Sequence, residues 1–379
     1  MTLLADYAAL LADGLRTVLT TRGPQRWRRL GFLLLFVTVW PLWVGLSRLC
    51  LLLDPLLFPA SSAPLEAPVF IVGNHRTGST HLQRLLASDP ETFSVCRLVD
   101  LLLPSLVQRR LAGLLGRLDA RIGAPGRRLL ERLDGMWGQE YRKIHSMGLW
   151  LPEEDEFFLL YTLGSGALWE CFPRVQRFRR LFWSDSDMPR AEQDRAMRFY
   201  RSVAQRHHHQ AGRGIWLSKN PLFSSRVGAL RRAFPDARFV VLVRDPRRVV
   251  PSTASLIHHA QRAVGALPPD GVEMDTIHEI CTRFYDEPLE HLAGLPPEQL
   301  AVVRCEDMRA DPVKTITGML DQLNVPISDT LREAIAASKT APSKATHRYT
   351  LGEWGLTEAG LLERYAEVAR RYGYGPGAE

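Results

Sequence analysis

The 379-residue sequence contains few cysteines, and none has the spacing of a metal-binding or disulfide-forming pattern. Its five cysteines are odd in number and scattered, and no C-x-x-C occurs. A zinc site and a disulfide framework are therefore not indicated, and a reducing compartment fits this usage. The sequence also lacks an N-x-[ST] glycosylation sequon, which favours the cytoplasm over a secretory lumen.

Internal repeats and long low-complexity tracts are also absent from the sequence. The composition, with 46% hydrophobic and 23% charged residues, is typical of a globular protein. The length permits one large α/β domain with additions, or two small domains. The net charge of +7 suits an anionic cofactor, and it would equally suit nucleic acid or an anionic membrane surface.

Residues 68–86, PVFIVGNHRTGSTHLQRLL, predict a strand, a tight loop and a helix. The apolar run 69–72 is typical of a strand that is buried on both faces. Gly73 and Gly78 bracket the loop, where the backbone must turn sharply, and a helix begins at Ser79. Such a turn directs free backbone N–H groups and the positive end of a helix at one point. It therefore predicts an anion site, with phosphate as the first candidate.

The spacing of the two glycines is that of the phosphate loop, G-x-x-x-x-G-K-[ST], but the lysine of that motif is missing. Ser79 stands in its place, and the cation of the loop is Arg76. A nucleotide triphosphatase needs the lysine on its β- and γ-phosphates. From this stretch alone, an ordinary glycine-containing turn remains the alternative.

A second stretch, residues 238–255 (RFVVLVRDPRRVVPSTAS), has the same strand-to-helix organisation. Arg244 ends the apolar strand, Asp245 predicts an N-cap, and Pro246 suits the first helical position. Ser252 follows Arg244 by eight residues. Together the two stretches resemble the sulfotransferase family that uses 3′-phosphoadenosine 5′-phosphosulfate (PAPS). The resemblance is greatest to the bacterial branch, whose loop reads R-[ST]-G-[ST]-T, and it extends over about residues 67–373.

This resemblance implies a three-layer α/β domain of the P-loop type, with a mostly parallel central sheet and the nucleotide across the carboxyl ends of the strands. In this family, a strand-terminal Arg and a Ser eight residues later hold the 3′-phosphate of PAPS, which gives these roles to Arg244 and Ser252. Arg76 would face the sulfuryl group in transfer. Lys219, at the end of a predicted strand, would border the cofactor or the acceptor. The other residues expected to bind the cofactor are Gly73, Thr77, Gly78, Ser79, Thr80 and His81.

Two residues are rival candidates for the base that takes the proton from the acceptor. Asp100 lies where related bacterial sequences carry a Glu, and the alternative is an Asp on a helix surface. His145 precedes the P-E-E-D-E of residues 152–156, where the family often shows a His and then P-E-E-[CD] near the acceptor. The four acids are also typical of a solvated helix start, and we predict no metal site. Residues 207–209, three consecutive histidines, predict a solvated helix end, because adjacent helical side chains cannot converge on one ion.

Residues 30–53 form a strongly apolar run with the length of a membrane span. An amphipathic helix and a basic patch are predicted before it, in residues 1–29. Pro41 in its middle and Arg48 near its far side resist a simple span. A single crossing, a kinked hairpin, an interfacial helix pair and a helical subdomain packed on the core or on a second subunit all remain open. We divide the chain into a membrane-associated helical segment, residues 1–60, and a catalytic domain, residues 61–379.

Two further segments carry weaker signals. Residues 105–145 are basic and rich in leucine, which predicts a surface-seeking amphipathic region or, alternatively, a solvated helical face over the core. Residues 347–356 resemble the C-terminal loop of the family, which covers the nucleotide.

The predicted reaction is the transfer of a sulfuryl group from PAPS to a hydroxyl or amine of an acceptor whose class the sequence does not identify; a lipid and a glycan are both considered. We predict a membrane-associated protein with a cytoplasmic catalytic domain, no metal and no nucleic-acid partner. Two alternatives remain open. One is a P-loop kinase or nucleotide hydrolase that depends on magnesium, and the other is a membrane-bound nucleotide-binding scaffold without turnover.

Overall fold

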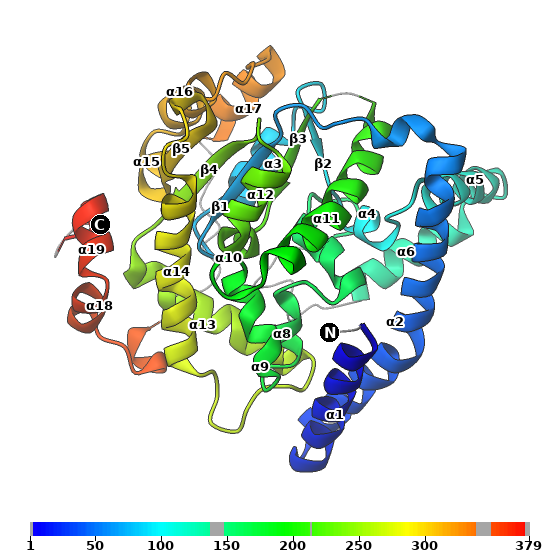
Figure 1. Ribbon diagram of the computed structural model, residues 1–379, viewed down its shortest axis with the longest axis horizontal. Coiled ribbons are helices and arrows are strands. Elements are labelled where there is room, and N and C mark those ends of the chain that lie inside the picture. Colours follow the sequence, from blue (N-terminus) through cyan, green and yellow to red (C-terminus); the bar gives the residue numbers. More distant parts are fainter. Residues whose placement is uncertain (1–2, 137–147, 213, 339–349, 376–379) are drawn as a thin grey trace.

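The computed structural model describes residues 3–136, 148–212, 214–338 and 350–375, and a five-stranded sheet lies at its centre (Figure 1). All neighbouring strands pair in parallel, in the order β2–β3–β1–β4–β5. This arrangement confirms the predicted α/β class with a parallel sheet. The strands are β1 (Val69–Gly73), β2 (Phe93–Val95), β3 (Ile215–Lys219), β4 (Arg238–Val243) and β5 (Leu300–Arg304).

Helices cover both faces of the sheet, because the apolar side chains of each central strand point alternately to one face and the other. In β1, Val69 and Ile71 pack under α3, α15, α16 and α17, whereas Phe70 and Val72 pack under α11, α12 and α14. The bounds are α3 (Ser79–Leu86), α11 (Arg190–Ala211), α12 (Val227–Ala233), α14 (Met274–Leu292), α15 (Cys305–Ala310), α16 (Pro312–Gln322) and α17 (Asp329–Ser338). The fold is thus the expected three-layer sandwich.

The register of the sheet brings three strand ends together. Ile71 of β1 pairs with Lys219 of β3 on one side and with Val240 of β4 on the other. The residues that follow these strands therefore meet at one edge of the sheet. At that edge, a third apolar cluster joins α13 (Pro246–Ala263) and α14 to the N-terminal and C-terminal helices.

Shorter elements close the carboxyl edge of the sheet and the ends of the domain. They are α4 (Leu98–Leu102), α8 (Ala167–Cys171), α9 (Gln176–Arg179), α10 (Ser184–Asp187), α18 (Glu358–Arg364) and α19 (Ala366–Tyr372). The short 3-10 helices are η1 (Pro59–Ser62), η2 (Asp155–Thr162), η3 (Arg180–Trp183), η4 (Pro221–Arg226), η5 (Pro297–Gln299) and η6 (Leu351–Trp354).

The N-terminal segment forms two helices that pack on each other, α1 (Leu3–Thr20) and α2 (Pro24–Leu57). Helix α2 continues through Pro41 and Pro55, so residues 30–53 do not turn back as a hairpin. It is long and apolar enough to cross a membrane, and in the described part of the chain it is the one helix of that kind. Only 22% of its most apolar window is buried.

One face of α2 nevertheless contacts the α/β domain along its whole length. Buried side chains of this face include Leu33, Phe36 and Val44. Polar contacts with the domain run from one end of the helix to the other: Arg29 to the Cys171 carbonyl (2.7 Å), Trp43 to the Leu102 carbonyl (3.0 Å), Arg48 to the Tyr161 carbonyl (3.0 Å) and Ser105 to the Asp54 carboxylate (2.7 Å). The helix therefore lies against the domain and presents its other face outward.

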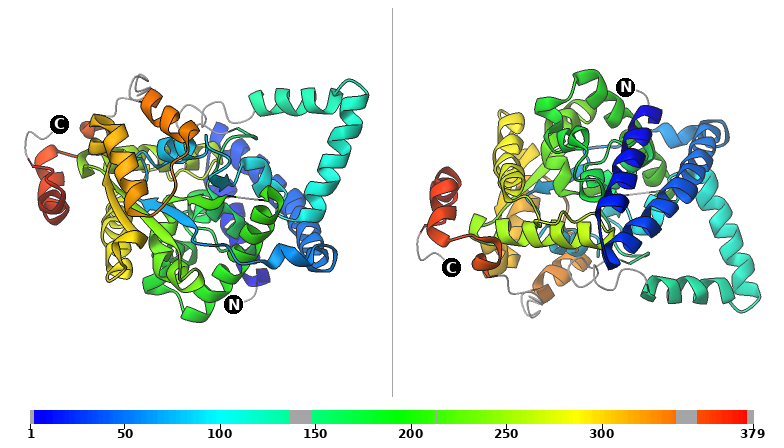
Figure 2. Two further views of the ribbon diagram at one scale, coloured as in Figure 1. Left: turned by 90° about the horizontal axis from the view of Figure 1, so that it is seen from above. Right: turned by 90° about the horizontal axis from the view of Figure 1, so that it is seen from below.

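Helices α5 (Leu106–Arg121) and α6 (Pro125–Met136) project away from the body of the molecule (Figure 2). The start of α5 packs against α2, but its later residues are exposed nearly all round. The alternative of a solvated face over the core is therefore wrong for the described residues of this segment beyond the start of α5, and the surface-seeking amphipathic region stays a prediction.

Candidate active site

The loop between β1 and α3 needs glycine at both predicted positions. Gly73 has φ +127°, and a Cβ atom there would lie 2.2 Å from the Leu242 carbonyl oxygen of the neighbouring strand. Gly78 has φ +88°, and a Cβ atom would approach the side chain of Met308 to 3.0 Å. Arg76, between them, also has a positive φ of 66°, which costs a non-glycine residue about 1 kcal/mol. The backbone is thus held in the tight turn that the spacing predicts.

The turn leaves backbone donors at the start of α3. The first backbone hydrogen bonds of the helix are donated by His81 and Leu82 to the Gly78 carbonyl, at 3.0 and 3.1 Å. The N–H groups of Ser79 and Thr80 come before these donors and have no acceptor within the helix. With the positive end of the helix, they form the kind of site that binds phosphate groups.

The two predicted motifs meet at this loop. The Nε atom of Arg76 donates to the Ser252 hydroxyl at 3.1 Å, and Arg244 donates to the Arg76 carbonyl oxygen at 2.7 Å. Asp245 caps α13 by accepting from the Arg247 N–H at 2.8 Å, as its position predicts. The structure therefore brings Arg76, Arg244 and Ser252 together from two separate strand-to-helix turns.

These cations are held close to one another in a partly buried place. Burial lowers the pKa of Arg244, and the guanidinium groups of Arg309 and Arg76 act in the same direction. A bound anion would relieve both the lost hydration and the mutual repulsion of these groups. The residues present thus fit a phosphorylated ligand that reaches from the loop to Arg244 and Ser252.

Lys219 reaches the same loop from the end of β3. Its side chain is 1% exposed, and its ammonium group donates to the Thr80 hydroxyl at 3.2 Å and to the Glu154 carboxylate at 2.6 Å. Its predicted place at the carboxyl edge of the sheet agrees with these contacts. Glu154 was not predicted as a site residue, and its pairing with Lys219 depends on tertiary structure.

The acids beside Glu154 are buried, so a solvated helix start is wrong for them. Asp155 accepts from the Ser218 hydroxyl at 2.8 Å and from the Tyr200 hydroxyl. Glu156 accepts from the Ser165 hydroxyl at 2.6 Å and lies 3.6 Å from Arg226. Buried carboxylates of this kind are retained only with such partners.

A third carboxyl group joins Glu154 and Glu156. The pKa of Glu170 is raised to about 8, chiefly by burial and in part by the nearby charges of Glu154 and Glu156. Burial likewise raises the pKa of Glu156 to about 7, although Arg226 opposes the shift. Carboxyl groups that titrate near neutrality can exchange a proton with a substrate, so this cluster is chemically competent for acid–base work beside Lys219.

The two residues predicted as the base have different outcomes. Asp100 accepts from the Arg97 N–H at 2.9 Å, which caps α4, and lies 3.6 Å from the His207 ring. Its carboxylate is thus engaged with its own helix, and its role as a base stays a prediction. His145 lies outside the described residues, as do residues 347–349 of the predicted nucleotide-covering loop.

His207 is buried, so the predicted solvated helix end is wrong for this residue. It contacts Arg109 at 2.6 Å and the Val95 carbonyl at 2.9 Å, and burial lowers its pKa to about 4. Among the residues that the structure describes, no group of three or more His, Cys, Asp or Glu side chains is arranged so that it could hold a metal ion.

Comparison with known proteins identifies relatives of this chain. Residues 68–329 match the model of the family described as "Sulfotransferase family". Omega-hydroxy-beta-dihydromenaquinone-9 sulfotransferase Stf3 of Mycobacterium bovis is 26% identical over 329 residues, which are 83% of this chain and 77% of Stf3.

Two crystal structures share the fold. Sulfotransferase STF9 from Mycobacterium avium superposes with a TM-score of 0.70 at 20% identity, over 94% of this chain and 88% of that one. Sulfotransferase STF1 from Mycobacterium tuberculosis superposes with a TM-score of 0.69 at 21% identity, over 96% of this chain and 92% of that one.

Proposed function

The chain belongs to the sulfotransferase family, and on this premise we propose that it transfers a sulfuryl group from PAPS to a hydroxyl or amine of a lipid-borne acceptor. The observation that carries the proposal is the junction of Arg76, Ser252 and Arg244 at the phosphate-loop turn. An enzyme whose nucleotide carries a separate 3′-phosphate needs a second cationic clasp of this kind to bind that phosphate, whereas a nucleotide kinase does not.

The residues at the turn have separate tasks in this proposal. The N–H groups of Ser79 and Thr80 bind the 5′-phosphosulfate, and Arg244 with Ser252 binds the 3′-phosphate. Arg76 stabilises the negative charge that spreads as the sulfuryl group moves. When bound, PAPS supplies that group in activated form.

Lys219 is the second cation at the reacting centre in this proposal. Its contacts with Thr80 and Glu154 fix the ammonium group beside the first turn of α3. A cation held there stabilises charge on the departing phosphate oxygen without having to reorganise. Glu154 would then be a positioning residue, because it acts through Lys219.

The acceptor must lose a proton as its oxygen or nitrogen bonds to sulfur. Asp100 and His145 are the bases predicted from the sequence, and the structure adds Glu170, whose raised pKa suits proton uptake near neutral pH. Separate substitutions of the three, with kcat measured across pH, distinguish them, because only the base should change the acidic limb of the profile.

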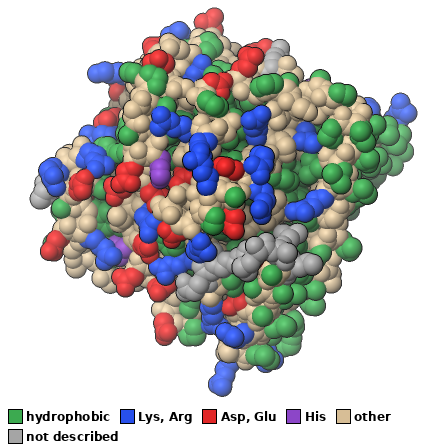
Figure 3. Space-filling model, in the orientation of Figure 1, with side chains coloured by type: hydrophobic (Ala, Val, Ile, Leu, Met, Phe, Trp, Pro, Cys, Tyr) green, Lys and Arg blue, Asp and Glu red, His purple; other side chains and the backbone are tan. Residues whose placement is uncertain are grey.

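We propose a lipid as the carrier of the acceptor group for two reasons. The relative Stf3 is named as a sulfotransferase of an omega-hydroxylated dihydromenaquinone, a lipid quinone. In this chain, hydrophobic side chains gather on the side of the molecule where α2 and α5 lie (Figure 3). Exposed residues there include Leu42 (76%), Leu49 (57%), Leu115 (56%) and Ile122 (73%).

The contacts of α2 favour attachment to one membrane face over a single crossing. A crossing would pull the helix from the domain and leave Arg29 and Asp54 without the partners they have now, which is costly for buried charges. With α2 held on the domain, its outer face can enter the interface while the catalytic domain stays in the cytoplasm, where PAPS is made.

The experiment that tests this proposal is an acceptor screen with PAPS carrying radioactive sulfur. Purified protein is incubated with fractionated lipids, glycans and small molecules of its own cells. Label should move to the lipid fraction for the wild type and not for Arg76→Ala. Label in the glycan fraction alone would contradict a lipid acceptor and leave the transferase activity in place.

A further inference from the structure

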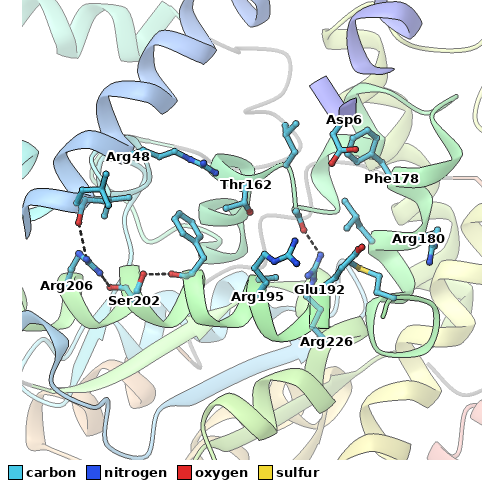
Figure 4. Close-up of a pocket in the computed structure, with 18 residues that line it drawn as sticks. Asp6, Arg48, Thr162, Phe178, Arg180, Glu192, Arg195, Ser202, Arg206 and Arg226 are labelled. Carbon is cyan, nitrogen blue, oxygen red and sulfur yellow. Dashed lines mark hydrogen bonds between the residues drawn. The ribbon is translucent and has the colours of Figure 1, made fainter. Parts of the chain in front are cut away.

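A cavity of about 620 Å³ lies between α2, the end of η2 and α11, and it shares no lining residue with the phosphate-loop site (Figure 4). Its volume is in the range of sites that bind small molecules. None of its lining residues belongs to the phosphate loop or to the Arg244–Ser252 clasp. The proposed reaction therefore does not account for it.

The charged residues of this cavity are mostly cations. Two carboxylates, Asp6 and Glu192, line it as well. Arg206 is paired with Asp54 at 2.9 Å and Arg226 lies 3.6 Å from Glu156, both just outside the lining, so with these two carboxylates counted the region keeps one net positive charge. Among the described residues, Arg48, Arg180 and Arg195 have no carboxylate within ion-pair distance; Arg48 donates to the Tyr161 carbonyl and Arg180 to the Asp187 carbonyl. The five arginines of the lining are Arg48, Arg180, Arg195, Arg206 and Arg226.

Arg226 is the most telling of these cations. Its side chain is 1% exposed, and one of its nitrogens donates to the Gly164 carbonyl at 2.5 Å. Its Nε and second terminal nitrogen have no hydrogen-bond partner among the described residues. Buried donors without partners are uncommon, and a ligand oxygen would satisfy them. Arg195 reaches the same space as Arg226, and Arg48 reaches in from α2 (Figure 4).

The walls of the cavity are apolar and lead to the outer face of α2. Leu51 and Leu52 line it from α2, and Phe178, Leu181 and Phe199 line it from the domain. Leu52 is also 73% exposed, so it belongs both to the cavity and to the outer surface of the helix. A ligand could thus place a charged group on the arginines and an apolar tail along α2.

We propose that this cavity binds the head group of an anionic phospholipid. The guanidinium groups of Arg195 and Arg226 hold the phosphate oxygens, which they match as bidentate donors. The acyl chains leave past Leu51 and Leu52 into the membrane that the outer face of α2 meets. The bound lipid then holds the catalytic domain against the membrane. Arg226 is also close in sequence to Ser224, whose hydroxyl accepts from the N–H of Gly73 (2.8 Å) and donates to its carbonyl (2.9 Å), so the lipid site is linked to the phosphate loop through η4.

The test uses dihexanoyl phosphatidylglycerol below its micelle concentration, titrated into the full-length protein in a calorimeter. Dihexanoyl phosphatidylcholine and inorganic phosphate are titrated in parallel. Phosphatidylglycerol should bind more tightly than either, since it alone has net negative charge together with acyl chains. Equal binding of the two phospholipids would show an unselective apolar site, and equal binding of inorganic phosphate would show a simple anion site. Either result would overturn the proposal.

Arg195→Gln is the test variant, and Arg198→Gln is its matched control. Both arginines are exposed on α11, but Arg198 does not line the cavity. Arg195→Gln should weaken phosphatidylglycerol binding about fivefold, the effect of one arginine at an anionic lipid, and Arg198→Gln should change it less than about twofold. Equal effects of the two variants would mean general surface attraction and would overturn the proposal. Thermal unfolding without lipid verifies that both variants fold.

Binding of 3′,5′-ADP is measured on the same samples to separate this inference from the proposed function. Arg195→Gln should keep the wild-type affinity for that nucleotide, because Arg195 lines the proposed lipid cavity and not the phosphate-loop site. A wild type that binds phosphatidylglycerol but not 3′,5′-ADP would refute the proposed function and support the lipid site. A wild type that binds 3′,5′-ADP but not phosphatidylglycerol would refute the lipid site and support the proposed function.

Discussion

The most informative substitution in this protein is Arg244→Ala, because it separates recognition of the 3′-phosphate from the integrity of the loop. Arg244 donates to the Arg76 carbonyl at 2.7 Å, so its loss also loosens the phosphate loop. That second effect should weaken every nucleotide that uses the loop. The ratio of affinities for 3′,5′-ADP and 5′-AMP cancels it, because the two ligands differ only in the 3′-phosphate.

The expected loss of preference for 3′,5′-ADP follows from the chemistry of the contact between guanidinium and phosphate. A charge-assisted hydrogen bond from guanidinium to phosphate contributes about 1.5–3 kcal/mol, which corresponds to about 10- to 150-fold in affinity. We expect the wild type to prefer 3′,5′-ADP by at least that factor and Arg244→Ala to lose most of the preference. The assay is titration calorimetry of both nucleotides at one ionic strength, since surface charges are screened by salt.

Arg248→Ala is the matched control for this experiment. Arg248 lies four residues further on, in α13, and is exposed. Its replacement by alanine removes one positive charge from the same segment but leaves Arg244 and Ser252 in place. Its preference for 3′,5′-ADP should equal that of the wild type. A wild type with equal affinity for the two nucleotides, or an equal loss in both variants, would refute the assignment of Arg244.

Three further predictions concern turnover, stability and the membrane. Arg76→Ala should lower kcat much more than it weakens 3′,5′-ADP binding, because its charge acts on the sulfuryl group in flight, and parallel losses would assign it to binding alone. Glu170→Gln should raise the thermal stability more at pH 8 than at pH 5. The pKa of Glu170 is raised from 4.5 to about 8, so the folded chain binds more protons than the unfolded chain between these values, and stability falls as pH rises through that range. An equal change in Tm at both pH values would contradict this. Replacing Leu42 and Leu49 by Lys should release the protein from vesicles, whereas Val313→Lys, on an exposed position of α16, should not, and co-sedimentation that persists in the double variant would exclude α2 as the membrane contact.

The central part of the fold could be predicted because its signals are local. The strand 69–73, the glycines of the loop and the start of α3 at Ser79 follow from an apolar run, two backbone requirements and a helix signal. Arg244 at the end of β4 and the cap at Asp245 are equally local. Since parallel strands end at one edge, these signals also placed the two motifs near each other.

The features that the sequence did not predict depend on tertiary packing. Strand β2 has only three residues, which are too few to show the alternation of apolar and polar residues that identifies a strand. Glu154 and His207 are both polar, and only the approach of Lys219 and of Arg109 shows that their side chains are inside the domain. The continuous course of α2 through Pro41 was not predicted either, because a proline inside a helix removes a hydrogen bond and usually kinks or ends the helix.

The measurement that tests the central claim most directly is the fate of PAPS that carries one radioactive label on sulfur and another on the 5′-phosphorus. The protein is incubated with this donor and with total membrane lipids, in the presence of a chelator. We predict that the sulfur label alone moves to the lipid fraction and that 3′,5′-ADP is released in equal amount. Movement of the phosphorus label, or binding of the donor with neither label transferred, would contradict sulfuryl transfer as the function of this protein.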